Sequence, residues 1–358
     1  MSLKIIPKGA IGAWISRLQS RGYRVVGPVE KHGQYVFDDI QDAQALVLDY
    51  PTTVLPPKKF MLPSREELFR FNTQTMEMEE TIEAEPTAIF GMHTCDLHSM
   101  RLLDTVHGIG YADRHYQARR DQMTFVSIEC LKPCMPGSFC KSMGTLTTPE
   151  HCDLHLTDLG KSYAIEVGSE KGAALLEGCT QVWDANDEDE DRLNDAMAEK
   201  WPNFQYRLEF DITELPELLG VSQNSAVWDA LGEICLACGM CTQVCPTCYC
   251  FDVEDEVGIT LEEGVRVRKW DSCQIEKFAV VAGGHNFRSS RALRQRHRFF
   301  RKGKYQYEAF GELGCVGCGR CALSCLVDIT PIKTFNALHR LRASAEAGET
   351  MTVEEALS

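Results

Sequence analysis

The cysteines are the residues whose spacing most clearly predicts chemistry. The chain has 17 cysteines in 358 residues, and two runs share the spacing Cys-x2-Cys-x2-Cys-x3-Cys. The first run is Cys235, Cys238, Cys241 and Cys245, and the second is Cys315, Cys318, Cys321 and Cys325. This spacing is typical of bacterial ferredoxins, in which the fourth cysteine of each run binds the other of two [4Fe–4S] clusters.

The ligands are therefore expected to be shared crosswise between the runs. One cluster takes Cys235, Cys238, Cys241 and Cys325, and the other takes Cys315, Cys318, Cys321 and Cys245. Structural zinc is the alternative, but zinc sites use paired Cys-x2-Cys motifs and need no tripled spacing. A disulfide framework is not expected in a cytosolic chain, where thiols are kept reduced.

Nine cysteines lie outside the two runs. Three of them, Cys130, Cys134 and Cys140, fall in one loop-like stretch, and Cys95 follows a probable strand. Together these four thiolates could bind a third cluster, with His93 or Asp96 replacing one of them. The alternative is that they are plain structural cysteines. Cys248 and Cys250 directly follow the first run, where they serve as small buried hydrophobes or as an alternative ligand.

The elements that position these residues suggest an α+β chain with two domains. Residues 1–220 alternate strand-like and helical patterns, which favours a mixed α/β domain. Helical patterns are expected at 13–20 and, from a Ser64–Glu67 capping box, at 64–71. Strands are expected at the ranges 23–26, 34–37, 45–48, 87–90, 123–128 and 163–167.

Residues 221–358 read as a mainly helical, ferredoxin-like domain that holds the two clusters. The long insert between the cysteine runs supports this interpretation, because Arg291–Lys302 has a helical pattern. The acidic run 184–191 is expected to be a solvated loop or the first turn of a helix.

Composition and charge exclude several classes of function. The net charge is −15, which argues against general nucleic-acid binding. No apolar run approaches the ~20 residues that a membrane span needs, and the N-terminus is a poor secretory signal, so a cytoplasmic protein is expected. Residues 266–304 carry a local charge of +10, leaving −25 for the remainder. Within this segment, Arg288, Arg291, Arg294 and Arg298 are candidates for stabilising reduced clusters or holding an acidic partner. The alternative is that they pair with the negative charge elsewhere in the chain.

Several stretches together resemble one known family. They are DYPTTVLPPKKFMLP (49–63), HTCDLHSMRLLD (93–104), SIEC…FCKSMGT (127–145), CLACGMCTQVCPTCYCF (235–251), RKWDSC (268–273), AGGHNFR (282–288) and CVGCGRC (315–321). The chain is similar to the iron–sulfur β subunit of soluble NAD(P)-linked [NiFe] hydrogenases, or sulfhydrogenases, and to the A subunit of anaerobic sulfite reductase.

The resemblance implies an electron relay rather than an enzyme that turns over substrate by itself. The expected partners are an FAD- and NAD(P)-binding subunit and a catalytic subunit of the [NiFe] hydrogenase or sirohaem sulfite reductase type. A flavin module feeding a heterodisulfide-reductase-like complex is an alternative, and an iron–sulfur redox sensor is an alternative of a different class. The resemblance also favours the third cluster at Cys95, Cys130, Cys134 and Cys140, although the family's Cys-x-Cys becomes Ser138-Phe139-Cys140 here.

Overall fold

The computed structural model describes residues 2–149 and 152–358, and the chain divides into two compact units. The first unit contains Met1–Met61 and Glu83–Gln205, and the second contains Leu62–Ile82 and Tyr206–Ser358. Residues 62–82 were expected in the N-terminal domain, whereas in the structure they belong to the second unit. The chain therefore leaves the first unit and returns to it before the cysteine runs begin.

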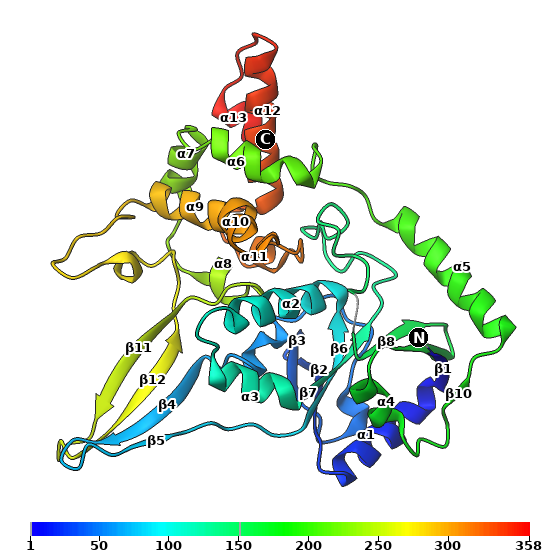
Figure 1. The fold of residues 1–358 in the computed structure, drawn as a ribbon. Helices are drawn as coiled ribbons and strands as arrows, with labels where there is room; N and C mark the ends of the chain where they lie inside the picture. The colour runs from blue at the N-terminus through cyan, green and yellow to red at the C-terminus, as the bar shows by residue number, and fades with distance from the viewer. Residues whose placement is uncertain (1, 150–151) are drawn as a thin grey trace. The chain divides into compact units, whose positions relative to one another are not determined.

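The first unit is built on an eight-stranded mixed sheet (Figure 1). Its strands are β1 (Ser2–Pro7), β2 (Arg24–Lys31), β3 (Gln34–Asp39), β6 (Thr87–His93), β7 (Met123–Ile128), β8 (Leu154–Asp158), β9 (Ser162–Val167) and β10 (Trp183–Asp184). Their order is β10-β1-β9-β8-β7-β6-β2-β3, and β2, β6, β7 and β8 run parallel. The described α-helices are α1 (Ile11–Ser20), α2 (Thr94–Gly108), α3 (Arg114–Gln122), α4 (Glu170–Leu176) and α5 (Asp187–Asn203).

The core of this unit follows from the alternation of side chains along the strands. Phe90 of β6 packs in one apolar cluster with Trp14 of α1 and Leu175 of α4. Trp14 Nε1 also donates a hydrogen bond to Leu175 O at 2.8 Å. Helix α2 packs against β6 and β7, in front of the parallel strands in Figure 1. Because β6 and β7 pair in parallel, with His93 opposite Ile128, their carboxyl ends lie at the same edge of the sheet.

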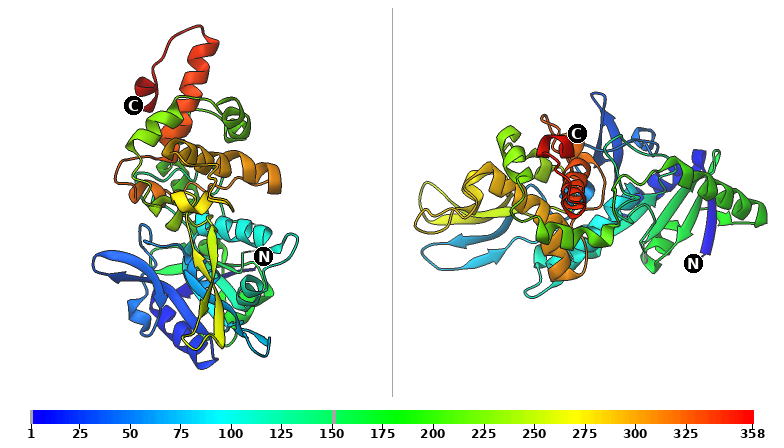
Figure 2. Two further views of the ribbon diagram at one scale, coloured as in Figure 1. Left: turned by 90° about the vertical axis from the view of Figure 1, so that its left-hand side faces the viewer. Right: turned by 90° about the horizontal axis from the view of Figure 1, so that it is seen from above.

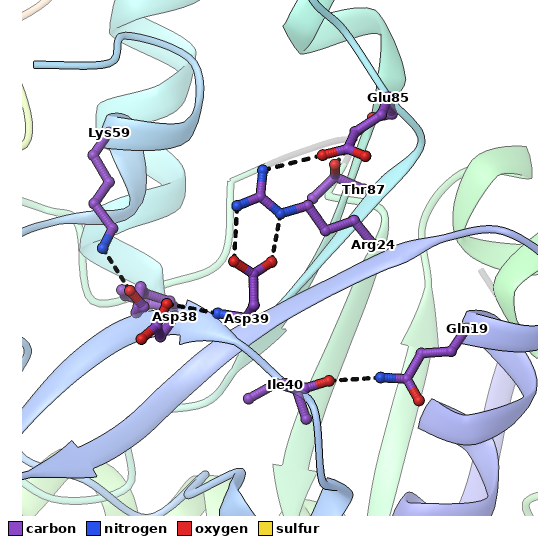
Figure 3. Close-up of polar contacts among 9 residues, drawn as sticks. Gln19, Arg24, Asp38, Asp39, Ile40, Lys59, Glu85 and Thr87 are labelled. Carbon is purple, nitrogen blue, oxygen red and sulfur yellow. Dashed lines mark hydrogen bonds and ion pairs between the residues drawn. The ribbon is translucent and has the colours of Figure 1, made fainter. Parts of the chain in front are cut away.

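A polar cluster fastens the β2–β3 edge of the sheet (Figure 3). Arg24 of β2 donates to both carboxylate oxygens of Asp39 at 2.5 and 3.0 Å, and to Glu85 at 3.2 Å. Gln19 of α1 donates to Ile40 O at 2.5 Å. Because these groups are partly exposed, each ion pair is worth about 1 kcal/mol or less, and the cluster positions the edge more than it stabilises it.

The second unit combines a four-stranded antiparallel sheet with helices (Figures 1 and 2). Its strands are β4 (Arg65–Asn72), β5 (Met78–Glu80), β11 (Phe251–Val257) and β12 (Glu263–Trp270), in the order β11-β12-β4-β5. The described α-helices are α6 (Leu215–Val221), α7 (Val227–Ile234), α8 (Met240–Gln243), α9 (Arg291–Phe300), α10 (Gln306–Phe310), α11 (Arg320–Leu323), α12 (Pro331–Glu346) and α13 (Val353–Leu357). A π-helical turn, Arg301–Tyr305, joins α9 to α10.

Two expected elements are wrong. Residues 64–71 form strand β4 instead of a helix, because they pair with β12 and β5 and this pairing overrides the local capping signature. Residues 45–48 are not a strand. There Asp42 accepts a hydrogen bond from Gln44 N–H at 2.9 Å and caps a 3-10 turn at Ala43–Ala45.

The other expected elements are confirmed. The strands expected at 23–26, 34–37, 87–90, 123–128 and 163–167 correspond to β2, β3, β6, β7 and β9, and the expected helix at 13–20 corresponds to α1. The acidic run begins α5, whose capping box joins Asn186 and Asp189. Arg291–Lys302 is helical, as its pattern predicts.

Candidate iron–sulfur centres

Both cysteine runs fold into the same backbone shape. Ala237 and Gly239 in the first run have φ angles of 52° and 76°, and Gly317 and Gly319 in the second have φ angles of 68° and 75°. A short helix follows each loop, and these helices, α8 and α11, pack against each other. The left-handed conformation costs a non-glycine residue roughly 1–2 kcal/mol. Ala237 therefore adopts the same left-handed conformation as Gly317 in the second run, although its Cβ disfavours this conformation.

One pocket is lined by four cysteines from both runs, namely Cys235, Cys238, Cys241 and Cys325. These are the four that the spacing assigns to one cluster. Backbone N–H groups already point at two of the sulfurs: Ala237 donates to Cys235 Sγ and Ile329 donates to Cys325 Sγ, each at 3.3 Å. Hydrogen bonds to the charged form of a group favour that form, here the thiolate that binds iron. Cys238 is exposed, so one side of this pocket faces solvent.

The other four cysteines lie close enough to affect each other electrostatically. Burial, together with the charges of Cys321 and Cys245, raises the pKa of Cys315 to about 12. Burial also raises the pKa of Cys318, where Cys245 and Cys321 act in the same direction. Metal ligands must be deprotonated, so thiols in this environment become thiolates when iron binds them.

The geometry of the donors fits clusters better than single ions. Within 2–149 and 152–358, no three Cys, His, Asp or Glu side chains converge tightly enough to hold one metal ion. The ligands of a [4Fe–4S] cluster stand further apart because each cysteine binds a different iron. Four cysteine sulfurs around one pocket, with backbone N–H donors aimed at two of them, match that requirement.

Arg298 of α9 is a buried cation between the two sets of cysteines. Its side chain is 5% exposed and hydrogen-bonds to Cys321. Burial alone disfavours its charge, but the pKa of Arg298 is raised because Cys241, Cys321 and Cys245 surround it with negative charge. A fixed positive charge at this place would favour the reduced, more negative state of a [4Fe–4S] cluster bound by these cysteines.

Two further side chains on the same helical surface contact the cysteines. Gln295 Nε2 donates to Cys235 Sγ at 2.9 Å. Lys302 hydrogen-bonds to Cys248, and its pKa is raised despite burial because Cys245 and Cys248 lie nearby. Neither residue was predicted from the sequence. The spacing 291, 295, 298 and 302 could have identified them, because i, i+4, i+7 and i+11 share one helix face.

The two arginines predicted to bind the cofactor take different positions. Arg291 Nη1 donates to Cys235 O at 2.7 Å, so it supports the backbone of the first loop. Arg288 Nη1 lies 3.4 Å from His297 Nδ1 and has no described contact with a cysteine. Arg294 Nη1 donates to the backbone of Arg288 and Ser289. Arg291 therefore holds the backbone of the first loop, and Arg298 places a positive charge beside a cysteine sulfur.

The remaining candidate cysteines lie in the first unit, at the carboxyl ends of two parallel strands. His93 ends β6 and pairs with Ile128, which ends β7. Cys95 lies two positions after His93, and Cys130 lies two positions after Ile128. The parallel pairing of β6 and β7 therefore brings both cysteines to one edge of the sheet. Ligands of parallel sheets commonly bind at this edge. The backbone N–H of Thr94 also hydrogen-bonds to the Cys130 thiol.

Cys134 and Cys140 approach Cys130 in the loop after β7. Burial raises the pKa of Cys130 well above its ordinary value, and the charges of Cys134 and Cys140 contribute. Cys130 and Cys134 line one pocket together with His93, whose ring stacks on Tyr50 at 4.4 Å between centroids. The structure thus brings three thiols together, and Cys95 is next in the sequence to Thr94, whose backbone N–H contacts the Cys130 thiol.

A buried ionic network supports this loop. Lys200 of α5 is fully buried and donates to Glu129 Oε1 at 2.7 Å and to Leu146 O at 2.9 Å. His155 Nε2 lies 3.3 Å from Glu129 Oε2, and Cys130 N–H donates to Glu129 Oε1 at 2.8 Å. The charge of Lys200 also lowers the pKa of Cys140, although burial dominates and raises that pKa to about 11.

Together, the repeated loops and the cysteine-lined pocket define a ferredoxin-type iron–sulfur protein. A family model described as a 4Fe-4S dicluster domain matches residues 234–329. The chain is 35% identical over 334 residues to Sulfhydrogenase 2 subunit beta of Pyrococcus furiosus, which covers 90% of this chain and 94% of the relative. The chain belongs to the sulfhydrogenase β-subunit family, which confirms the resemblance seen in its motifs. No solved structure matches the chain.

The structure also bears on the expectation of no membrane span. Throughout 2–149 and 152–358, none of the helices has both the length and the apolar character required to cross a bilayer.

Proposed function

We propose that this chain is the electron-transfer subunit of a hydrogenase-type complex and passes electrons singly along [4Fe–4S] clusters. The observation that carries the proposal is the pocket where Cys325 of the second run joins Cys235, Cys238 and Cys241 of the first. When bound, such clusters supply one-electron chemistry. Membership of the sulfhydrogenase β-subunit family supports the same function.

Two clusters would be held crosswise by the second unit. Cys235, Cys238, Cys241 and Cys325 bind one of them, and Cys315, Cys318, Cys321 and Cys245 bind the other. The mutual electrostatic effects of the latter four cysteines support this division. Arg298 stabilises the electron on either cluster, and Arg291 and Gln295 hold the loop around Cys235.

A third [4Fe–4S] cluster would be held in the first unit by Cys95, Cys130, Cys134 and Cys140. The support is the edge of the parallel sheet where Cys95 and Cys130 emerge, and the electrostatic coupling of Cys130 with Cys134 and Cys140. Lys200 supplies a fixed positive charge there, which offsets part of the negative charge of the thiolates. The chain then contains three electron-carrying sites.

One partner subunit docks at the exposed side of the first cluster pocket. Leu236, Met240 and Leu326 line this pocket and are 55%, 43% and 87% exposed, next to the exposed Cys238. Exposed apolar side chains grouped around a functional site indicate a surface that another chain covers. The partners proposed are an FAD- and NAD(P)-binding subunit and a catalytic hydrogenase subunit, assembled in the cytoplasm, where reduced cysteines persist.

The test uses the complex purified anaerobically with its partner subunits. NADH or NADPH is added, and the clusters of this chain are followed by freeze-quench EPR. The Cys238→Ser variant is expected to block electron flow from the nicotinamide to hydrogen, while the catalytic subunit still exchanges electrons with viologen dyes. The matched control is Cys179→Ser, because Cys179 is a partly buried cysteine that packs against the apolar core of the first unit. Full nicotinamide-linked hydrogen production by the Cys238→Ser complex would overturn the proposal.

A further inference from the structure

Two of the cysteines that are not assigned to a cluster meet at the base of a hairpin. Cys250 directly precedes β11, and Cys273 follows β12 in the sequence Asp271-Ser272-Cys273. The two strands pair antiparallel, with Phe251 opposite Trp270. Asp271 N–H then donates to Cys250 O at 3.0 Å, which extends the pairing beyond the strands. The hairpin therefore holds the two cysteines side by side.

Their thiols contact each other. Cys250 and Cys273 form a side-chain hydrogen bond. Cys273 is 5% exposed, and Gln274 Nε2 donates to its Sγ at 3.5 Å, whereas Cys250 is half-buried. A disulfide requires the two sulfurs to approach to about 2.05 Å, and thiols already in hydrogen-bond contact need only a local adjustment to do so.

The pair lies near cysteines of both sets. On one side, the charge of Cys273 raises the pKa of Cys241, an assigned ligand of the first cluster. On the other side, Cys250 affects Cys248, which hydrogen-bonds to Cys245, an assigned ligand of the second cluster. The thiol pair is thus a near neighbour of both sites.

We propose that Cys250 and Cys273 form a dithiol–disulfide couple that exchanges two electrons with the two [4Fe–4S] clusters. This inference rests on the proposed function. On oxidation, the S–H bond of Cys273 breaks, a bond forms between the two sulfurs, and the proton leaves to solvent past the half-buried Cys250. The two electrons reduce the two clusters, one each. In the reverse direction two reduced clusters return one electron each, and one proton is taken up.

The charges around Cys250 suit this chemistry. The hydrogen bond from Cys273 lowers the pKa of Cys250 to about 6, and the positive charges of Lys302 and Arg301 contribute. The thiolate is the reactive form in disulfide chemistry. Binding of a metal ion is the competing use of two cysteines. It would need further ligands beyond this pair.

The test compares thiol state and iron content in the same samples. The complex, purified anaerobically, is poised at a series of potentials with mediators, alkylated, digested and examined by mass spectrometry. We expect a Cys250–Cys273 cross-linked peptide at high potential that disappears on reduction with a two-electron slope. Cys250→Ser and Cys273→Ser should lose this peptide and two reducing equivalents per chain yet keep their full iron. Cys179→Ser serves as the control and should retain both.

Three results would decide against the couple. Full alkylation of both thiols at every potential, beside full iron content, overturns it and leaves the proposed function intact. Loss of about four irons per chain in either serine variant shows instead that the residue is a cluster ligand. A wild-type chain without iron overturns the proposed function, and the electron exchange with it.

Discussion

Replacing Arg298 with glutamine should lower the reduction potentials of both clusters in the second unit. The guanidinium is 5% exposed, hydrogen-bonds to Cys321 and lies near Cys241, so its charge acts on each site with little screening by solvent. Reduction adds a negative charge to a cluster. Removing the cation that faces this charge makes reduction less favourable.

The size of the shift can be estimated from this contact. A charge hydrogen-bonded to a ligand sulfur lies roughly 6 Å from the added electron, and at an effective dielectric constant of about 20 the two interact by about 2.8 kcal/mol. For one electron, about 1.4 kcal/mol corresponds to 59 mV. The upper limit is therefore about 120 mV. Entry of water in place of the guanidinium lowers this, so a shift of about 60–120 mV is expected.

The assay is an anaerobic redox titration of the holoprotein followed by EPR. Arg298→Lys, which keeps the charge, should stay within about 30 mV of the wild type and also controls for folding. Arg296→Gln on the same helix is the second control, because Arg296 donates to Gln223 O instead of to sulfur. A change below about 20 mV in Arg298→Gln with full iron content would refute the assigned electrostatic role.

Three further predictions concern stability. Lys200→Met should destabilise the protein by about 3–5 kcal/mol in anaerobic urea unfolding, because it leaves the buried Glu129 carboxylate without its cation. The double variant with Glu129→Gln is expected to recover stability. A loss below about 1 kcal/mol in Lys200→Met contradicts a stabilising role for the ion pair. The pKa of His297 is lowered to about 4 by burial and two neighbouring arginines. The unfolded chain therefore binds the extra proton first as the pH falls, and between pH 7.5 and 5.5 the wild type should lose about 1.3 kcal/mol more than His297→Phe. Equal losses in the two proteins argue against a neutral, half-buried histidine. Gly232→Val should lower the free energy of unfolding by about 1–3 kcal/mol, since a Cβ there would lie 2.6 Å from Ala292 N and force α7 away from α9. An unchanged urea midpoint would show that close packing of these two helices does not contribute to stability.

The clustering of the run cysteines in the second unit could be predicted because the loop geometry within each run is local. The spacing within Cys235–Cys245 sets how the backbone wraps around a cluster, and the structure shows the same left-handed positions in both loops. The spacing also assigned Cys325 to the first site, and the structure places it in that pocket. A loop conformation that depends on about ten consecutive residues can be predicted without knowing the fold.

The charges around the clusters were harder to predict because they depend on which helix face is turned inward. The sequence offered Arg288, Arg291, Arg294 and Arg298 as candidates, and of these Arg298 is the one beside sulfur. Lys302, which was not among the candidates, also lies beside sulfur. Helix geometry starting from Arg291 would have selected Gln295, Arg298 and Lys302. The sequence alone does not state that Arg291 marks the inner face, since that follows from its bond to Cys235 O.

Contacts between distant segments left no signal in the sequence. Lys200 meets Glu129 across 71 positions, and nothing around either residue predicts a buried ion pair. Strand β4 was mistaken for a helix for the same reason, because its partner β12 is far away along the chain. By contrast, β6 and β7 were predicted, and their parallel pairing explains why Cys95 and Cys130 emerge together.

The most direct test of the electron-relay account is the amount of iron and acid-labile sulfide per chain. The measurement is made on anaerobically purified protein together with EPR of the dithionite-reduced state. The account predicts about twelve of each, with three interacting S = 1/2 signals, because three [4Fe–4S] clusters are assigned. About eight would remove the cluster at Cys95, Cys130, Cys134 and Cys140, and zinc in place of iron and sulfide would contradict the account as a whole.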